Sequence, residues 1–218
     1  MNRKDRDEYV AREFDRTAAS YDESRLFRSY QRRTQLLVIS RIPVEKGHTV
    51  LDLGCGTGEG TIDIARKLEG TGRVIGMDLS EKMIEQAKRK LDSFPYDNVD
   101  FFVGSGASLD YNGYFDFVFS TNAFHHFENK EEIFSRIWKS LRDDGMFIVQ
   151  DICDDYFLMK LVDLAGKIGE RAHAGSTTSR ALHSLFASSG FTDIDIEKTK
   201  LNRFWGIMIG RGTRRANG

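Results

Sequence analysis

Three glycines and two acids between residues 50 and 78 have the types and spacing of a binding site for a polar ligand. The segment Val50-Leu51-Asp52-Leu53-Gly54-Cys55-Gly56-Thr57-Gly58 is an apolar strand pattern that runs directly into a turn and then opens a helix. Glycine permits a positive φ and lets a ligand approach the backbone, while a helix N-terminus presents N–H groups without partners. We therefore expect a polar ligand at Gly54, Gly56 and Gly58.

The two carboxylates narrow the choice of ligand. Asp78 ends the next predicted strand, where a carboxylate can accept hydrogen bonds from both hydroxyls of a ribose. Asp52 lies in a strand of Val and Leu, where burial would be unfavourable unless a polar group such as an ammonium met it. Both acids favour a nucleoside cofactor. The structural alternative is a tight turn in which Asp52 caps a neighbouring element and Asp78 faces water.

The spacing of the glycines distinguishes between nucleotide cofactors. A dinucleotide fingerprint requires G-x-G-x-x-G, whereas the third glycine here comes one residue early. Glu59 stands where that glycine would be, and its charge would be unfavourable beside a pyrophosphate. The G-K-[ST] ending of a P-loop is missing, which argues against an ATPase.

The elements that must position these residues follow from the hydrophobic pattern. From residue 48 onward short apolar runs alternate with amphipathic ones, which is typical of β-α units around a mostly parallel sheet. Ser80 is expected to cap the helix after the second strand, and the chain before residue 45 is predicted to be helical without a strand. The expected strands are residues 49–53, 73–77, 99–103, 115–120, 146–152, 191–196 and 204–209.

Length and composition limit the class of protein. A chain of 218 residues suits one α/β domain, and a formal charge of -1 provides no field that would attract nucleic acid. Cys55 and Cys153 are too few for a disulfide framework, which favours a reducing compartment. The first residues are highly charged, and no apolar stretch has the length of a membrane-spanning helix. These features predict a cytoplasmic protein with no membrane span.

On these motifs the chain resembles the class I S-adenosylmethionine-dependent methyltransferases, and in particular the small-molecule branch that includes enzymes of ubiquinone and menaquinone biosynthesis. Residues 50–58 resemble the first motif of the family and residues 76–80 the second, within a likeness that runs from about residue 14 to residue 210. The resemblance implies an α/β fold with a doubly wound, seven-stranded, mostly parallel, Rossmann-like sheet and an N-terminal helical lid. It also implies S-adenosyl-L-methionine as the cofactor.

The same resemblance assigns roles within the cofactor site. The glycine turn and Asp52 would hold the methionine part, Asp78 the ribose, and Leu79 with Met83 the adenine. The chain departs from the family at Gly104-Ser105-Gly106, where Gly-Asp-Ala is usual, so a hydroxyl replaces an adenine-binding acid and affinity should be lower. The further cofactor-binding residues that we infer are Tyr21 in the lid, Ser105, Gly106 and Thr121.

The segment 120–127 resembles the stretch that lines the methyl-transfer site in this family. It lacks Asn/Asp-Pro-Pro-Tyr, which argues against exocyclic amines and glutamine side chains and favours an oxygen, carbon or sulfur atom of a small molecule. His125 and His126 follow the fourth strand, and Asp151 ends the fifth, which the doubly wound order places beside it. A histidine near a carboxylate can accept a proton near neutral pH, so these three are candidate catalytic residues. Alternatively, the histidines pack and cap the following loop.

The predicted organisation has an N-terminal helical segment or lid over residues 1–45 and a cofactor-binding domain over residues 46–210. That domain includes a helical cap over residues 154–175, and a solvated basic tail is predicted for residues 211–218. The apolar residues of the cap, with Phe124 and Phe127, favour an acceptor with an apolar or ring portion. The cap could equally be core or a dimer face, so both a monomer and a homodimer are compatible with the sequence. A nicotinamide-dependent oxidoreductase and a non-catalytic nucleoside-binding module are the alternative functions.

Overall fold

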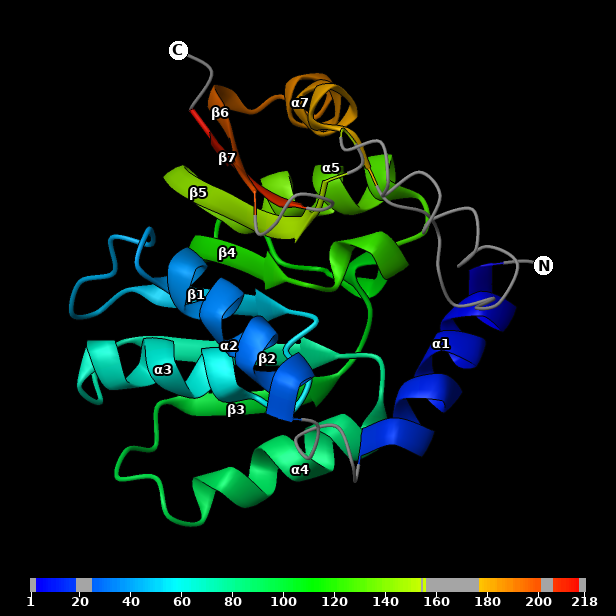
Figure 1. The fold of residues 1–218 in the computed structure, drawn as a ribbon. Helices are drawn as coiled ribbons and strands as arrows, with labels where there is room; N and C mark the ends of the chain where they lie inside the picture. The colour runs from blue at the N-terminus through cyan, green and yellow to red at the C-terminus, as the bar shows by residue number, and fades with distance from the viewer. Residues whose placement is uncertain (1–2, 19–24, 154, 156–176, 201–205, 216–218) are drawn as a thin grey trace.

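The computed structural model describes residues 3–18, 25–153, 155, 177–200 and 206–215, which form one sheet with helices on both faces (Figure 1). The strand order is β3-β2-β1-β4-β5-β7-β6, which can be followed from the bottom to the top of Figure 1. Strands β1 to β5 are parallel, and β7 lies antiparallel between β5 and β6. The strands are β1 (Thr49–Leu53), β2 (Arg73–Asp78), β3 (Val99–Val103), β4 (Phe115–Thr121), β5 (Leu141–Ile152), β6 (Thr192–Lys200) and β7 (Gly206–Thr213). The predicted seven-stranded, mostly parallel sheet is confirmed.

Helices cover the sheet in two layers. Side chains of α2, α3 and α4 pack on one face, and those of α5 and α7 pack on the other. Helix α1 packs against α4 and stands at one side of the sheet, at the right of Figure 1. The helices are α1 (Arg3–Thr17), α2 (Arg25–Ile39), α3 (Glu59–Leu68), α4 (Glu81–Leu91), α5 (Lys130–Ser140) and α7 (Ser179–Ser188), with 3-10 turns η2 (Gly106–Ser108) and η3 (Phe124–His126).

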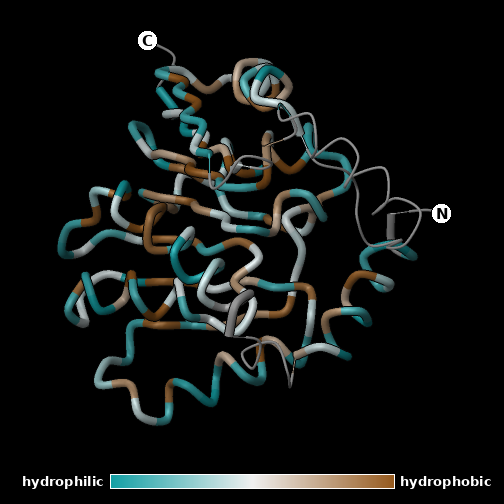
Figure 2. The backbone as a smooth tube through the Cα atoms, viewed as in Figure 1, coloured by the Kyte–Doolittle hydropathy of each residue, from teal (hydrophilic) through white to brown (hydrophobic). Residues whose placement is uncertain are grey.

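The central strands are apolar on both faces because helices bury both of them. All five residues of β1 are buried, and the hydrophobic colouring of Figure 2 follows the central strands through the middle of the molecule. On the α5 and α7 side, Phe134 packs edge-on against Phe147 and Phe186, with ring centroids 5.2 and 5.0 Å apart. These contacts hold α5 and α7 against β5, and so fix the helix that follows η3 and its histidines.

Local signals in the sequence account for the helix that follows β2. The Ser80 side chain accepts a hydrogen bond from Met83 N at 3.1 Å, as predicted for the N-cap of α4. Ile84 and Ala87 form the buried side of this helix. The helix therefore starts immediately after Asp78, and this start fixes the position of that carboxylate at the sheet edge.

The C-terminal part of the chain differs from the prediction. Strand β7 continues to Thr213, beyond the predicted boundary at residue 210, because its pairing with β5 runs on to Met146. Arg214 exchanges backbone hydrogen bonds with Gly145 and Asp144, and its guanidinium lies 4.6 Å from the ring of Trp138. Residues 211–213 therefore continue the sheet, beyond the residue at which the basic tail was predicted to begin. β5 likewise begins at Leu141 rather than at residue 146.

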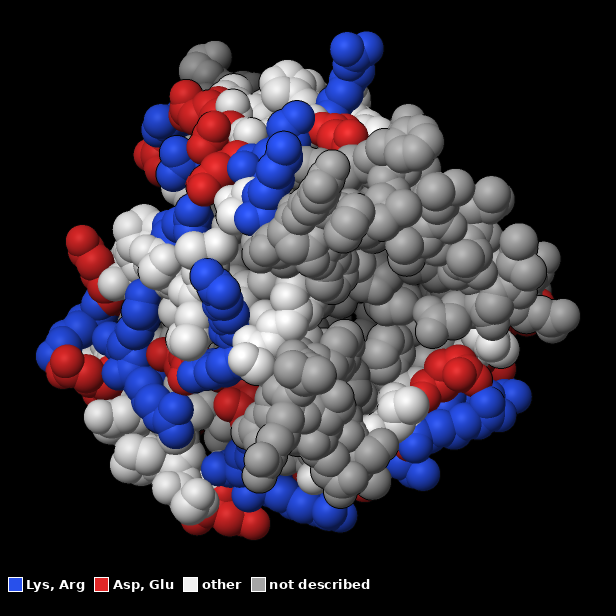
Figure 3. Space-filling model, viewed as in Figure 1, with Lys and Arg blue, Asp and Glu red and all other residues white. Residues whose placement is uncertain are grey.

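Surface charge and hydropathy agree with the composition. Lys and Arg side chains alternate with Asp and Glu on the face shown in Figure 3, as the formal charge of -1 suggests. Within the described parts of the chain, no helix combines the length and the hydropathy needed to cross a bilayer.

We predict that Gly58→Ala destabilises the protein more than Gly113→Ala, although both glycines have a positive φ, of 81° and 57°. A Cβ on Gly58 would lie 2.6 Å from the Phe101 ring and 2.9 Å from Ala87, whereas nothing lies within 4 Å of one on Gly113. The left-handed conformation costs about 1 to 2 kcal/mol in both variants, and overpacking adds about 1 to 3 kcal/mol at residue 58. Denaturant unfolding measures both losses, and equal losses would contradict the steric argument.

Candidate active site

The turn after β1 contains three glycines, and each has a different structural role. Gly54, Gly56 and Gly58 all have positive φ, of 78°, 53° and 81°. Gly54 N donates to Met77 O at 2.8 Å, and a Cβ on Gly54 would lie 2.5 Å from that of Ala123. Among the described residues, nothing lies within 4 Å of a Cβ position on Gly56. Gly54 and Gly56 line cavities, whereas Gly58 lines neither cavity at the turn and packs against Phe101.

The first of these cavities, of about 80 Å³, lies between the glycine turn, α1 and the start of α4. It collects most of the cofactor-binding residues predicted from the sequence, which come from the ends of β1, β2, β3 and β4. The predicted residues that line it are Gly54, Gly56, Asp78, Leu79, Met83, Ser105, Gly106 and Thr121. The sequence reasoning missed Asp7, Val10 and Phe14 of α1, together with Asn122.

A second cavity, of about 70 Å³, lies on the other side of the turn and was not predicted. It shares Gly54, Gly56, Thr121 and Asn122 with the first cavity, and its outer wall is α2. Gln31, Arg32 and Gln35 line it from that helix. The sequence signal for this cavity wall is that Gln31, Arg32 and Gln35 lie about one turn apart on a helix whose C-terminal half is apolar.

Asp78 holds the glycine turn against the start of α4. Its Oδ2 accepts a hydrogen bond from Gly56 N at 2.8 Å, and its Oδ1 accepts one from Ser80 N at 2.9 Å. Desolvation raises the pKa of Asp78, and these backbone hydrogen bonds reduce the rise. The carboxylate thus lines the first cavity with both oxygens already oriented.

Asp52 lies deeper in the protein than Asp78, and only one of its two carboxylate oxygens has a hydrogen-bond partner among the described residues. The carboxyl group is 1% exposed, and its Oδ2 accepts a hydrogen bond from the Thr61 hydroxyl at 2.7 Å. Its Oδ1 is buried without a hydrogen-bond partner among the described residues. Burial raises the pKa of Asp52 to about 7, against the lowering effect of the Thr61 hydrogen bond. A Cβ on Gly60 would lie 3.2 Å from Asp52 Oδ2 and 2.7 Å from Gln35 Nε2, so both side chains reach that glycine.

A histidine and a carboxylate pair at the ends of β4 and β5. His125 Nδ1 lies 2.8 Å from Asp151 Oδ1, and the backbone N of His125 donates to Asp151 Oδ2 at 2.7 Å. Burial by itself would raise the pKa of Asp151, but the charge and hydrogen bond of His125, together with backbone hydrogen bonds, lower it below the ordinary value. The predicted proximity of His125 and Asp151 is therefore present in the structure.

The neighbouring His126 has a different environment. Its ring packs edge-on against Phe14 of α1, with centroids 5.0 Å apart, and it lines the first cavity. The rings of His125 and His126 lie 3.9 Å apart, so the 3-10 turn η3 directs one histidine to Asp151 and the other to α1. Only the tertiary structure distinguishes them.

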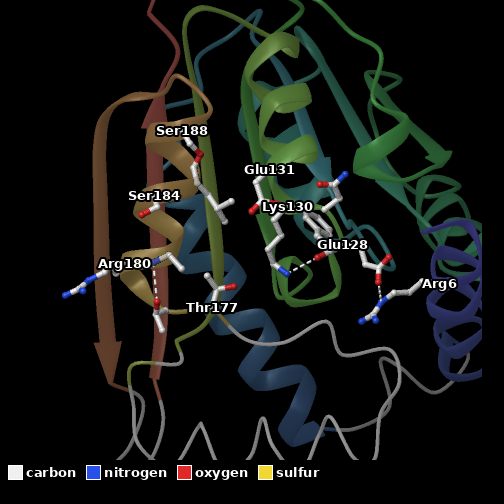
Figure 4. A pocket seen from close by; sticks show the side chains of 13 residues that line it. Arg6, Glu128, Lys130, Glu131, Thr177, Arg180, Ser184 and Ser188 are labelled. Atoms are coloured by element: carbon white, nitrogen blue, oxygen red, sulfur yellow. Dashed lines mark hydrogen bonds and ion pairs between the residues drawn. The ribbon is translucent and has the colours of Figure 1, made fainter. Parts of the chain in front are cut away.

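A wide cleft of about 1020 Å³ opens beyond η3, between the start of α5 and α7 (Figure 4). Phe127 and Glu128 line both this cleft and the first cavity. Arg6 of α1 forms an ion pair with Glu128 at 2.9 Å, at the boundary between the two. Most of the described side chains that line the cleft are polar, among them Lys130, Glu131, Thr177, Ser184 and Ser188.

Two predicted parts of the site lie outside the described residues. They are Tyr21 and nearly all of the helical cap predicted over residues 154–175. The described residues contain no group of three His, Cys, Asp or Glu side chains placed to hold a metal ion.

Comparison with known proteins bears on the identity of this site. Residues 44–202 match a family model described as a methyltransferase domain. The demethylmenaquinone methyltransferase of Lactococcus lactis is 23% identical over 215 residues, with 88% of this chain and 85% of the relative covered. The enzyme of the same name from Symbiobacterium thermophilum is 25% identical over 244 residues, with 99% and 96% covered. Phosphoethanolamine N-methyltransferase 2 of Haemonchus contortus, solved with S-adenosyl-L-methionine, has a TM-score of 0.74 at 17% identity, over 84% of this chain and 53% of that one.

We predict that the stability difference between the wild type and Asp52→Asn depends on pH. A pKa of about 7 in the folded protein lies above the unfolded value, so Asp52 stabilises the fold most when it is protonated at low pH. Between pH 5 and pH 8 the wild type should lose about 2 to 3 kcal/mol relative to the variant. Denaturant unfolding at both pH values measures this change.

The exposed Asp97→Asn serves as the control for this experiment, since that carboxylate is solvated in the fold. A pH-independent difference between the wild type and Asp52→Asn would mean that Asp52 is ionised throughout the range.

Proposed function

The chain belongs to the methyltransferase domain family and is an S-adenosylmethionine-dependent methyltransferase, and from this premise we propose that it methylates a small molecule at an atom that must first lose a proton. The observation that carries the proposal is the His125–Asp151 pair, because the His125 ring lies 3.9 Å from the ring of His126, which lines the first cavity. Because the chain belongs to a methyltransferase family, we no longer retain the alternatives of a nicotinamide-dependent oxidoreductase and a non-catalytic nucleoside-binding module.

The first cavity suits the adenosine part of the cofactor. Each oxygen of Asp78 accepts one backbone N–H, which leaves lone pairs that can accept the two ribose hydroxyls. Leu79 and Met83 offer apolar surface for a purine ring, and Ser105 follows β3 at the same edge. The open space at Gly56 would let the sugar approach the backbone closely.

The second cavity suits the methionine part. Arg32 is held by Asp63 and by Gln35 Oε1, so its guanidinium is already oriented where α2 faces the glycine turn, and it could bind a carboxylate. The unpartnered Oδ1 of Asp52 is a buried acceptor that an ammonium group would satisfy. We propose that Arg32 and Asp52 bind the two charged groups of the amino acid. Gly58, which lines neither cavity, would then support the turn through packing.

The bound cofactor supplies a methyl group on a positively charged sulfur. His125 would remove the proton of the acceptor, since an ionised Asp151 can only accept and therefore keeps the ring proton on Nδ1. Nε2 is then the basic nitrogen, as general base catalysis requires. Asp151 also stabilises the imidazolium that forms after proton transfer. Positioning the acceptor in line with the methyl group would supply much of the remaining rate.

The acceptor would enter through the wide cleft, because Phe127 and Glu128 connect that cleft to the cofactor cavity. We propose oxygen, carbon or sulfur as the methylated atom, since a proton-accepting base suits an ionisable hydroxyl, an acidic carbon or a thiol. The polar side chains of the cleft favour an acceptor with hydrogen-bonding groups on that side. Two relatives are named for demethylmenaquinone, which supports a ring-bearing or apolar portion as part of the proposal.

We predict that S-adenosylhomocysteine binds in the micromolar range and that NAD does not bind. We also predict that Asp78→Ala weakens the binding of S-adenosylhomocysteine by about 1 to 3 kcal/mol. The loss follows from removing charge-assisted hydrogen bonds to the ribose. Isothermal titration calorimetry measures the affinities, and a thermal melt shows whether the variant is folded. The exposed Asp97→Ala should bind like the wild type. An unchanged dissociation constant in a folded Asp78→Ala would remove this carboxylate from the site.

We predict that His125→Gln and Asp151→Asn slow methyl transfer by roughly 10² to 10⁴-fold while S-adenosylhomocysteine binds with unchanged affinity. The measurement is transfer of labelled methyl from S-adenosylmethionine to a panel of small phenols, hydroxyquinones and thiols, followed by mass spectrometry. The matched control is His183→Gln on α7, remote in sequence from the pair. Full transfer to the same acceptor by both variants would show that no base acts at this position.

A further inference from the structure

Lys130 lies against the turn that carries both histidines. It is the first residue of α5, and its Nζ donates a hydrogen bond to Phe127 O at 2.8 Å (Figure 4). The same ammonium group lies 5.1 Å from the centroid of the Phe124 ring, which is fully buried at the start of η3. Two contacts from one cation thus hold both ends of the turn, and so fix the backbone on which His125 stands.

The Lys130 ammonium also interacts electrostatically with Asp151. Burial lowers the pKa of Lys130, and the negative charge of Asp151 opposes that lowering. Other charges act on the same group: Arg6 of α1 adds to the lowering, whereas Glu131 and Glu128 oppose it. From α2, Tyr30 faces the same carboxylate, and its pKa is raised by burial and by the charge of Asp151, so its hydroxyl stays protonated.

A second cation beside Asp151 has a definite effect on His125. A buried carboxylate stabilises the imidazolium form of its partner histidine, and a histidine that is already protonated at neutral pH cannot accept a proton. A cation near the same carboxylate repels the proton on the imidazole and reduces this stabilisation. The net charge around the His125 ring therefore depends on Asp151 and Lys130, together with His126, whose ring centroid lies 3.9 Å away.

We propose that Lys130 is a positioning residue for the His125–Asp151 pair: its two contacts fix the turn that carries His125, and its positive charge opposes protonation of the imidazole. The inference deepens the proposed function and rests on it for the catalytic consequence. The charge of Lys130 acts on His125 through space and through their common neighbour Asp151, and Lys130 itself takes no proton from the acceptor.

The test is the titration of His125 by NMR in the ligand-free protein with isotope-labelled histidine, its signal assigned by its loss in His125→Gln. Lys130→Gln removes the charge and retains a donor for Phe127 O, whereas Lys130→Arg retains the charge. We expect Lys130→Gln to raise the pKa of His125 by about half a unit to one unit, and Lys130→Arg to leave it within about 0.3 unit. Lys139→Gln, at an exposed position of the same helix, should also leave it unchanged.

An unchanged His125 titration in a folded Lys130→Gln would overturn the proposal and leave Lys130 a purely structural role. If Lys130→Gln does not fold, the exposed Glu131→Lys adds a second cation next to Lys130 and retains both contacts of Lys130 with the turn, and it should lower the pKa of His125 by a few tenths of a unit. No shift in that variant would equally overturn the proposal.

The result of the His125 titration does not depend on whether the proposed function is correct. The titration needs no acceptor, whereas failure of the base mechanism would appear as undiminished methyl transfer by His125→Gln. In active preparations, the acidic limb of the kcat/KM profile should move to higher pH in Lys130→Gln and return in Lys130→Arg.

Discussion

The site depends on the burial of carboxylates at the ends of parallel strands. Asp52, Asp78 and Asp151 come from β1, β2 and β5, and removing such groups from water is unfavourable unless hydrogen bonds replace the lost hydration. Asp78 receives backbone N–H groups from the glycine turn and from the start of α4. Asp151 receives them from η3 and from its own strand. Asp78 and Asp151 therefore each fix the turn that follows a neighbouring strand, whereas Asp52 bonds to Thr61 in α3.

The three acids differ because their partners differ. Asp151 faces the His125 ring and backbone donors, and its pKa falls, so the carboxylate is ionised and orients the imidazole. Asp52 has one hydroxyl donor in a dry environment, and its pKa rises to about 7. A cationic ligand group beside Asp52 would favour the ionised form. One sheet edge thus holds an acid that is ionised at neutral pH and another whose pKa lies near neutrality.

The two N-terminal helices complete the site from opposite sides of the glycine turn. Phe14 of α1 meets His126 and lines the first cavity, while Arg32 of α2 lines the second. Polar contacts also attach helix α1: Asp15 accepts a hydrogen bond from the Ser80 hydroxyl at 2.6 Å, and Arg6 pairs with Glu128. These contacts join α1 to the start of α4 and to the boundary of the wide cleft.

The sequence by itself determined the order of strands and helices along the chain, the cap at Ser80, and the glycine turn between the strands that carry Asp52 and Asp78. These features depend on local patterns: buried parallel strands are continuous apolar runs, and glycine and serine mark the turns and caps that follow them. The tertiary structure decided which histidine meets Asp151, that Gly58 packs against Phe101, and that α2 contributes Arg32. It also placed residues 211–213 in β7 and the Lys130 ammonium against η3. Some of these contacts join residues that are far apart in the chain, and others separate the side chains of neighbouring residues. Their geometry follows from how the helices pack on the sheet, and short-range periodicity in the sequence does not encode that packing.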